Sequence, residues 1–270
     1  MRLINKLFFV VLLIFGLAVP SFADKIVVAG STTVLPISQK AAEEFMNNNS
    51  KANISVRGGG SGVGIACLID GSCDIGQSSR PIKESELDKA VSNGRTPKAH
   101  VIAMDGIAVI VHPSNSVTAL TKKQLKDIYT GKISNWSEVG GPYEKIVVVS
   151  RDSASGTFEA FGELALNKEK VRADALLQAS NQAVASTVAM TKGAIGYVGL
   201  GYISSSIKVL AIDGVKASKE SVLSGKYPIG RPLFMYTNGA PKGLAKEFID
   251  FILSSKGQML VEEDGFVSLK

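Results

Sequence analysis

The sequence predicts an α/β fold in which short strands alternate with helices along the chain. β-rich runs recur, glycine-rich loops follow several of them directly, and apolar residues at helical spacing come after those loops. This strand–loop–helix order is typical of a sheet with mainly parallel strands. The first three strands are expected at residues 25–29, 53–56 and 74–76, with a helix after each of the first two.

The middle of the chain opens with a long apolar run, Val101 to Val111, which predicts a strand that leaves one domain and enters another. Thr121 and Gln124 form a capping box that predicts the start of a helix, and Gly131 predicts its end. Residues 207–212 look like a second crossing strand. Other elements are expected as strands at 146–150, 194–198 and 233–237 and as helices over 158–165, 182–191 and 244–252.

Two domains joined by two crossing strands explain why the chain has no flexible linker. We see no stretch rich in proline, serine or glycine between the blocks, and no internal repeat. The chain would leave the first domain once and return once. We therefore expect a discontinuous first domain of residues 24–104 and 208–270 and a second domain of residues 105–207.

Residues 1–23 have the pattern of a cleavable signal peptide. Arg2 and Lys6 precede the 13-residue apolar run 7–19, and the small residues Ser21 and Ala23 suit signal peptidase. This run is shorter than the roughly 18–20 residues that cross a bilayer, which makes a membrane anchor the weaker alternative. No cysteine lies near the expected cut, so we expect an exported, soluble protein that is not a lipoprotein.

The charge balance suits a protein that meets a small anion. The formal net charge of +6 falls to +4 without Arg2 and Lys6, and the lysines and arginines form no basic block. Nucleic acid is therefore not an expected partner.

Cys67 and Cys73 are the only cysteines. In an oxidising compartment they form either a disulfide, the alternative we favour, or two buried thiols. Together with the distant His100 and His112 they show no zinc-like spacing, so no metal or other cofactor is expected.

Three strand-to-helix loops combine glycine with serine or threonine, at residues 30–33, 58–62 and 151–157. The start of a helix offers unpaired N–H groups and a partial positive charge, both of which favour an anion. Hydroxyl groups add donors, and Arg151 adds a planar cation that matches a tetrahedral oxyanion. Each loop alone could be only a helix cap. Three such loops, one with an arginine, predict an oxyanion site.

From about residue 25 to the C-terminus, these motifs resemble the phosphate-binding proteins of bacterial phosphate ABC transporters. The matching segments are GSTTVLP (30–36), GGGSGVGI (58–65), CDIGQSSR (73–80), YTGKISNW (129–136), RDSASGTFEAF (151–161) and QAVASTVAMTKGAIGYVG (182–199). The resemblance implies a type II periplasmic-binding-protein fold with a Venus-flytrap cleft between its domains. It also implies a monomeric periplasmic protein, not an enzyme, that binds inorganic phosphate and delivers it to a membrane permease.

The resemblance further implies which residues bind phosphate. They are Ser31, Thr32, Thr33, the Val34 amide, Ser61, Asp74, Ser78, Arg151, Ser155, Gly156 and Thr157. The chain departs from the family at Ser153, where many members have an acidic residue, and Asp152 stands one position earlier. The usual carboxylate partner of Arg151 is therefore absent or is supplied by Asp152 from another angle.

Asp74 is expected to select phosphate over sulfate. An ionised carboxylate only accepts hydrogen bonds, so it can pair with the P–OH of phosphate and repel a fully ionised oxyanion. The alternative is an aspartate that only supports its own loop.

Other functions fit the sequence less well. A serine hydrolase needs a positioned base, yet there is no Gly-x-Ser-x-Gly motif, and His100 and His112 look like surface residues. A binding protein or sensor for another oxyanion on the same fold is the remaining alternative, because a fold does not fix a physiological role.

Overall fold

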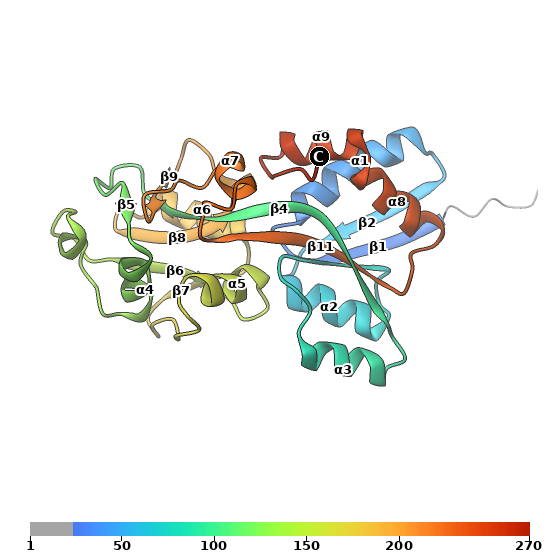
Figure 1. The fold of residues 1–270 in the computed structure, drawn as a ribbon, viewed down its shortest axis with the longest axis horizontal. Helices are drawn as coiled ribbons and strands as arrows, with labels where there is room; N and C mark the ends of the chain where they lie inside the picture. Colours follow the sequence, from blue (N-terminus) through green and yellow to red (C-terminus); the bar gives the residue numbers. More distant parts are fainter. Residues whose placement is uncertain (1–23) are drawn as a thin grey trace, which may run out of the picture.

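The computed structural model describes residues 24–270, which form two lobes joined by long strands (Figure 1). The predicted signal peptide, residues 1–23, lies outside the described residues. Within residues 24–270, none of the helices has the length and apolar character needed to span a membrane.

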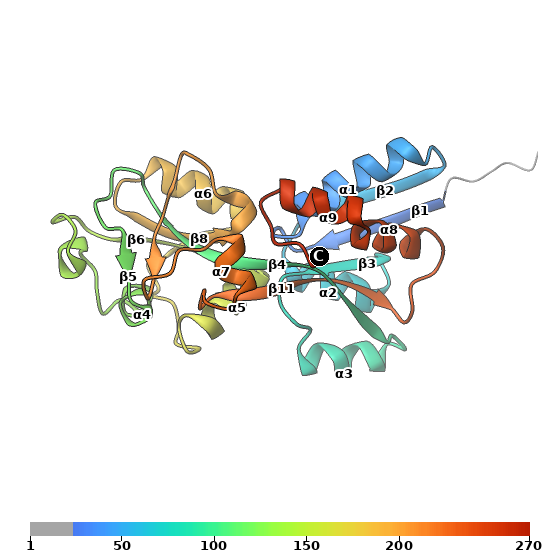
Figure 2. The ribbon, with the colours of Figure 1, turned by 45° about the horizontal axis from the view of Figure 1, so that its top comes forward.

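In the first lobe, the first two strands are each followed by a loop and a helix, as predicted, and the third is followed by a helix, Glu84–Ser92, that was not predicted. β1 pairs with β2 on one side and β3 on the other, and both pairings are parallel. The elements are β1 (Asp24–Gly30), α1 (Leu35–Asn48), β2 (Ala52–Arg57), α2 (Ser61–Asp70), β3 (Ile75–Ser78), α3 (Glu84–Ser92), α8 (Gly243–Leu253) and α9 (Ser255–Glu263). α1, α8 and α9 cover one face of this part of the sheet, and α2 and α3 cover the other (Figure 2).

The long strand predicted at Val101 to Val111 is confirmed as part of β4 (Pro97–Val111). β4 pairs with β11 (Gly230–Asn238) as far as Gly106 and with β8 (Ala194–Gly199) from Ile107 onward. It therefore leaves one lobe and enters the other. Both pairings are antiparallel, so the sheet is mixed, with parallel strands at its two ends and antiparallel strands at its centre.

The second lobe is built around the far half of β4. The predicted capping box of Thr121 and Gln124 opens α4, and Gly131 closes it in the left-handed conformation. The remaining elements are β5 (Ala119–Leu120), α4 (Lys122–Thr130), η1 (Trp136–Val139), β6 (Val147–Arg151), α5 (Gly156–Leu164), β7 (Leu176–Gln178), α6 (Asn181–Met190), η2 (Leu200–Tyr202), β9 (Lys208–Val209), β10 (Ala211–Ile212) and α7 (Lys219–Leu223).

The chain returns to the first lobe later than expected. Residues 207–212 are not a crossing strand but two short strands, β9 and β10, which pair with β4 and β5 inside the second lobe. Val222, Tyr227 and Ile229 also pack into the core of that lobe. β11 makes the return crossing instead, and its register against β4 begins at Gly230. Residues 208–229 accordingly pack with the second lobe.

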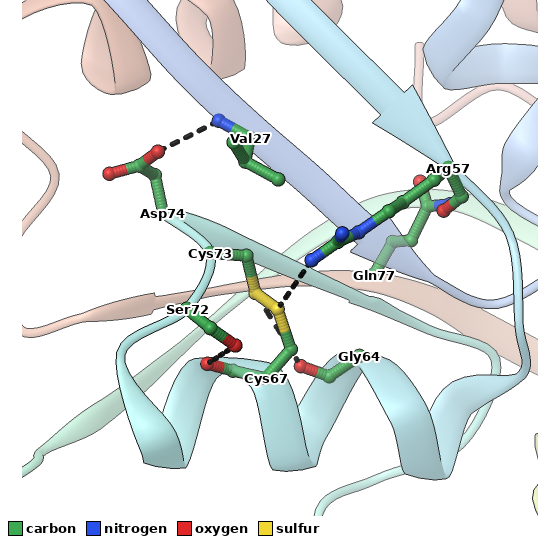
Figure 3. The surroundings of a disulfide bond; sticks show 8 residues. All are labelled: Val27, Arg57, Gly64, Cys67, Ser72, Cys73, Asp74 and Gln77. Atoms are coloured by element: carbon green, nitrogen blue, oxygen red, sulfur yellow. Dashed lines mark hydrogen bonds between the residues drawn. A yellow bond between two sulfur atoms is a disulfide. The ribbon is translucent and has the colours of Figure 1, made fainter.

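Cys67 and Cys73 form a disulfide that joins the last turn of α2 to the segment before β3 (Figure 3). This is the alternative favoured from the sequence. It links α2, which begins at Ser61, to the segment before β3, the strand that Ser79 directly follows.

Candidate functional site

The three predicted loops meet between the lobes. The first precedes α1, the second leads into α2, and the third leads from β6 into α5, so three helix N-termini point toward one region. Apart from the exposed Ser153, their hydroxyl side chains are almost fully buried there. We call these residues, with one further serine from the end of β3, the hydroxyl cluster: Ser31, Thr32, Thr33, Ser61, Ser79, Ser155 and Thr157.

The hydroxyl cluster joins the two lobes directly. Thr33 Oγ1 of the first lobe lies 2.9 Å from Thr157 Oγ1 of the second, in a buried hydrogen bond. Beside this pair, the Gly62 amide donates to the Ala154 carbonyl at 3.0 Å. A Cβ atom on Gly156 would lie 2.2 Å from Ser61 Oγ, so only glycine permits this approach. The structure is therefore that of closed lobes.

Arg151 stands at the end of β6 with its side chain 1% exposed. Its Nε donates to the Gln178 carbonyl at 2.9 Å, and its Nη2 donates to the Ala179 carbonyl at 3.0 Å. Nη1 is buried without a hydrogen-bond partner among residues 24–270. Burial lowers the pKa of this guanidinium, and Asp152 opposes that change. The side chain is thus held firmly and keeps one nitrogen free to bind an anion.

Backbone carbonyls replace the carboxylate that is missing at Ser153. Asp152 does not hold Arg151 by a hydrogen bond. Its Oδ1 accepts from the Ala154 amide at 3.0 Å and shapes the loop before α5.

A second buried arginine, Arg231 at the start of β11, was not predicted. Its Nη2 donates to Thr157 Oγ1 at 3.0 Å and lies 3.3 Å from Thr33 Oγ1. Nε and Nη2 also donate to Asp105 Oδ2, at 3.1 and 2.8 Å. Arg231 therefore contacts hydroxyl groups of both lobes while a carboxylate holds it from behind.

Asp105 is fully buried in the middle of β4. Its Oδ1 accepts from the Leu200 amide at 2.9 Å. Burial raises the pKa of this carboxyl group, and the Arg231 guanidinium opposes the rise. The signal available in the sequence was a lone acidic residue inside the apolar run 101–111, which indicates a buried, paired charge.

Asn181, at the start of α6, is a further contributor that was missed. Its Nδ2 donates to Thr32 Oγ1 and to Thr33 Oγ1, both at 3.0 Å, while its Oδ1 accepts from the Gly199 amide at 3.1 Å. It thereby ties the second lobe to the first loop. Nothing in its local sequence separates it from an ordinary residue at the start of a helix.

Several predicted residues play local roles in this region. Ser31 Oγ accepts from the amides of Thr33 and Val34, at 3.1 and 3.4 Å, and shapes the turn before α1. Ser155 Oγ accepts from the Phe158 amide at 3.2 Å and caps α5. These contacts are the capping roles weighed from the sequence.

At the end of β3, Ser79 rather than Ser78 joins the hydroxyl cluster. Ser78 Oγ donates to the Arg80 carbonyl at 2.8 Å, within its own turn. Ser79 donates its amide to Ser61 Oγ at 3.0 Å, and the two hydroxyl oxygens lie 3.3 Å apart. The turn after β3 therefore contributes Ser79 to the hydroxyl cluster, while the predicted Ser78 is engaged within its own turn.

Asp74 does not reach the hydroxyl cluster. It precedes β3, whereas the cluster lies after that strand, and its exposed carboxylate accepts from the Val27 amide at 2.7 Å (Figure 3). The expectation that Asp74 touches the ligand and selects phosphate is therefore wrong, because the residue stands at the opposite end of the strand. It supports its own segment, as the alternative supposed.

The contacts of the hydroxyl cluster suit binding better than hydrolysis. His100 Nε2 bonds to Thr237 Oγ1 and His112 Nδ1 to Ser114 Oγ, so neither histidine is hydrogen-bonded to a serine of the cluster. Within residues 24–270 there is also no group of three or more potential ligands that could hold a metal ion. The arrangement offers two buried cations and many small donors.

Comparison with known proteins agrees with this geometry. Residues 18–256 match the PBP superfamily domain. The chain is 37% identical to the phosphate-binding protein PstS of Bacillus subtilis over 91% of this chain and 81% of the relative. It is 36% identical to PstS of Borreliella burgdorferi over 92% and 91%.

Solved structures give the same result. A Clostridium perfringens protein assigned as a phosphate ABC transporter substrate-binding protein, crystallised with bound phosphate, matches with a TM-score of 0.86 and 36% identity. The match covers 92% of this chain and all of that one. A phosphate transport receptor from Vibrio cholerae matches with a TM-score of 0.74 and 31% identity, over 90% and 99% of the two chains. The chain therefore belongs to the PstS family of phosphate-binding proteins, within the PBP superfamily.

Proposed function

We propose that this protein captures inorganic phosphate between its lobes and delivers it to the membrane permease of a phosphate ABC transporter. The observation that carries the proposal is the pair of buried arginines, Arg151 and Arg231, set among hydroxyl groups from both lobes. Two desolvated cations against one buried carboxylate, Asp105, favour an anionic ligand.

The donors suit a small tetrahedral oxyanion. Arg151 keeps Nη1 for the ligand, and the first-turn amides at Gly156 and Thr157 have no acceptor within α5 because a helix leaves its first amides unpaired. Threonine and serine hydroxyls of the cluster rotate, so they can match oxygen atoms on several sides. Phosphate would exchange its hydration shell for these donors.

Selectivity over sulfate would then come from hydroxyl groups. A hydroxyl whose own hydrogen is already donated within the protein can only accept from the ligand, so a cluster hydroxyl held in this way can take the hydrogen of a P–OH group. Sulfate brings no such hydrogen and leaves that acceptor unpaired in a buried site, which costs free energy. This replaces the role that the sequence assigned to Asp74.

We further propose that phosphate binding closes the lobes. β4 and β11 are the two strands shared by both lobes, and they provide the natural hinge. The signal-peptide pattern of residues 1–23 supports a place of action outside the cytoplasm. We propose the periplasm as its compartment, a monomer as its state, and release by signal peptidase after Ala23 without a lipid anchor.

Isothermal titration calorimetry tests this function. The protein, freed of endogenous ligand by partial unfolding and dialysis, is titrated with phosphate, arsenate and sulfate in separate runs. We expect one phosphate per chain and no measurable heat from sulfate. Equal binding of sulfate, or no binding of phosphate, would contradict the proposal.

A further inference from the structure

A charged contact joins the lobes outside the hydroxyl cluster. Glu159 lies on α5 in the second lobe, and its Oε2 is 2.7 Å from Arg80 Nε and 2.8 Å from Lys83 Nζ. Arg80 and Lys83 belong to the segment between β3 and α3 in the first lobe. One carboxylate oxygen therefore contacts two cations across the interface.

The first-lobe side of this contact is already held in place. Arg80 donates from Nη1 to the Pro81 carbonyl at 2.9 Å, and from Nη1 and Nη2 to the two carboxylate oxygens of Glu86, at 2.8 and 2.7 Å. Its side chain is only 6% exposed. The guanidinium is thus fixed within its own lobe, and its Nε edge faces Glu159. The Nε–Oε2 contact is an ion pair, because Nε makes no hydrogen bond of good angle.

The charges on the two sides complement each other. On the first lobe, Glu86 pairs with Arg80, and the Lys83 ammonium has no ion-pair partner of its own lobe among residues 24–270, which leaves one positive charge in excess. On the second lobe, Glu159 is 17% exposed and has ion-pair partners only across the interface among residues 24–270. Opening the lobes would separate these charges, and closing them brings the charges together with little water between them.

The position of Glu159 separates this contact from the ligand donors. It follows Thr157 by two residues on α5, and its carboxylate is engaged by Arg80 and Lys83 rather than by the hydroxyl cluster. The contact therefore depends on the lobes being closed and not on touching phosphate.

We infer that Glu159, with Arg80 and Lys83, forms an electrostatic latch that holds the closed lobes together and slows phosphate release. Glu159 is a positioning residue, since it acts on the ligand only through lobe closure. The inference rests on the proposed capture of phosphate by closure. Phosphate meets the open protein before the latch forms, so the latch affects dissociation far more than association.

The test compares Glu159→Gln with Glu163→Gln on the same helix. Glu163 is an exposed residue whose ion-pair partner among residues 24–270 is Lys168 of its own lobe, at 3.5 Å, and it serves as the matched control. Phosphate dissociation and association rates are measured by stopped-flow fluorescence. We expect Glu159→Gln to release phosphate about tenfold faster, with an association rate within about twofold of the parent. Glu163→Gln should behave like the parent.

Salt and a double-mutant cycle sharpen the test. Release from the parent should speed up as sodium chloride is raised, and release from Glu159→Gln should respond less. Lys83, with a half-exposed side chain, can be changed to glutamine without disturbing the core. The effects of Lys83→Gln and Glu159→Gln should be non-additive, because both remove the same contact.

The outcomes separate the two proposals. If the parent does not bind phosphate, the proposed function fails. If the parent binds phosphate and the Glu159 and Glu163 variants release it at the same rate, the latch alone is wrong.

Discussion

Replacing Gly156 with alanine would put a methyl group into the tightest contact between the lobes. The new Cβ would lie 2.2 Å from Ser61 Oγ, 2.7 Å from Ser61 Cβ and 2.9 Å from Ser79 Oγ. Ser61 is fully buried and its hydroxyl accepts the Ser79 amide, so it has little room to move. The lobes would have to stay about 1 Å further apart to relieve the overlap.

That displacement weakens binding through closure. A shift of about 1 Å stretches the Thr33–Thr157 hydrogen bond, now 2.9 Å, beyond hydrogen-bonding range. Overpacking of this kind costs about 1–3 kcal/mol. If this cost destabilises only the closed form, it corresponds to a phosphate Kd about 5-fold to 150-fold higher.

Calorimetric titration of Gly156→Ala with phosphate measures this loss. Gly162→Ala is the matched control, because Gly162 lies on the same helix and nothing is within 4 Å of the Cβ it would gain. That control should bind phosphate like the parent and melt at a slightly higher temperature, since alanine favours a helix over glycine by about 0.5–1 kcal/mol. Unchanged binding by Gly156→Ala would refute the tight lobe contact.

Four further predictions follow from the site. Arg151→Ala should raise the phosphate Kd about tenfold or more in calorimetry, because a charge-assisted contact contributes about 1.5–3 kcal/mol. Binding equal to that of the parent would mean that phosphate does not bind at Arg151. Asp105→Asn leaves Arg231 without its anionic partner and should lower the free energy of unfolding by about 3 kcal/mol in urea titration; no loss would mean the pair is not buried. Asp74→Asn should leave phosphate affinity and the rejection of sulfate unchanged in competitive titration. Sulfate binding by this variant would show that Asp74 does select phosphate, as the sequence analysis expected. Burial raises the pKa of Tyr197 from 10.0 to about 12, so between these pH values the native state keeps a phenol proton that the unfolded chain loses. The free energy of unfolding should therefore fall as the pH rises from about 10 to about 12. A urea midpoint that stays constant across that range would contradict this.

Local signals explain what could be predicted from the sequence. The capping box at Thr121 and the hydroxyl-rich loops before α1 and α5 depend on residues close together in the chain. Their roles can therefore be predicted from the sequence without knowledge of the fold. The same holds for Arg151, which is the first residue of one of these loops.

The missed residues depend on contacts between distant segments. Arg231 and Asp105 are 126 residues apart, and only the pairing of β4 with β11 brings them together. Asn181 reaches Thr32 from 149 residues away. No local pattern encodes either contact, although the lone acidic residue in an apolar strand was a usable sign.

Asp74 was misplaced because the direction of a strand was overlooked. In an open α/β sheet, ligands bind at the carboxyl ends of the parallel strands. Asp74 stands before β3 and Ser79 after it, so the strand separates them by about 16 Å. The run 207–212 was misread for a different reason, since a short apolar run suits a crossing strand and two short strands packed within one lobe equally well.

A crystal structure of the protein grown with phosphate tests the central claim most directly. It should show one tetrahedral anion bonded to Arg151 Nη1 and to donors of both lobes, among them Thr33 and Thr157, with Asp74 remote from it. An anion that contacts only one lobe, or that lies away from Arg151, would contradict the account.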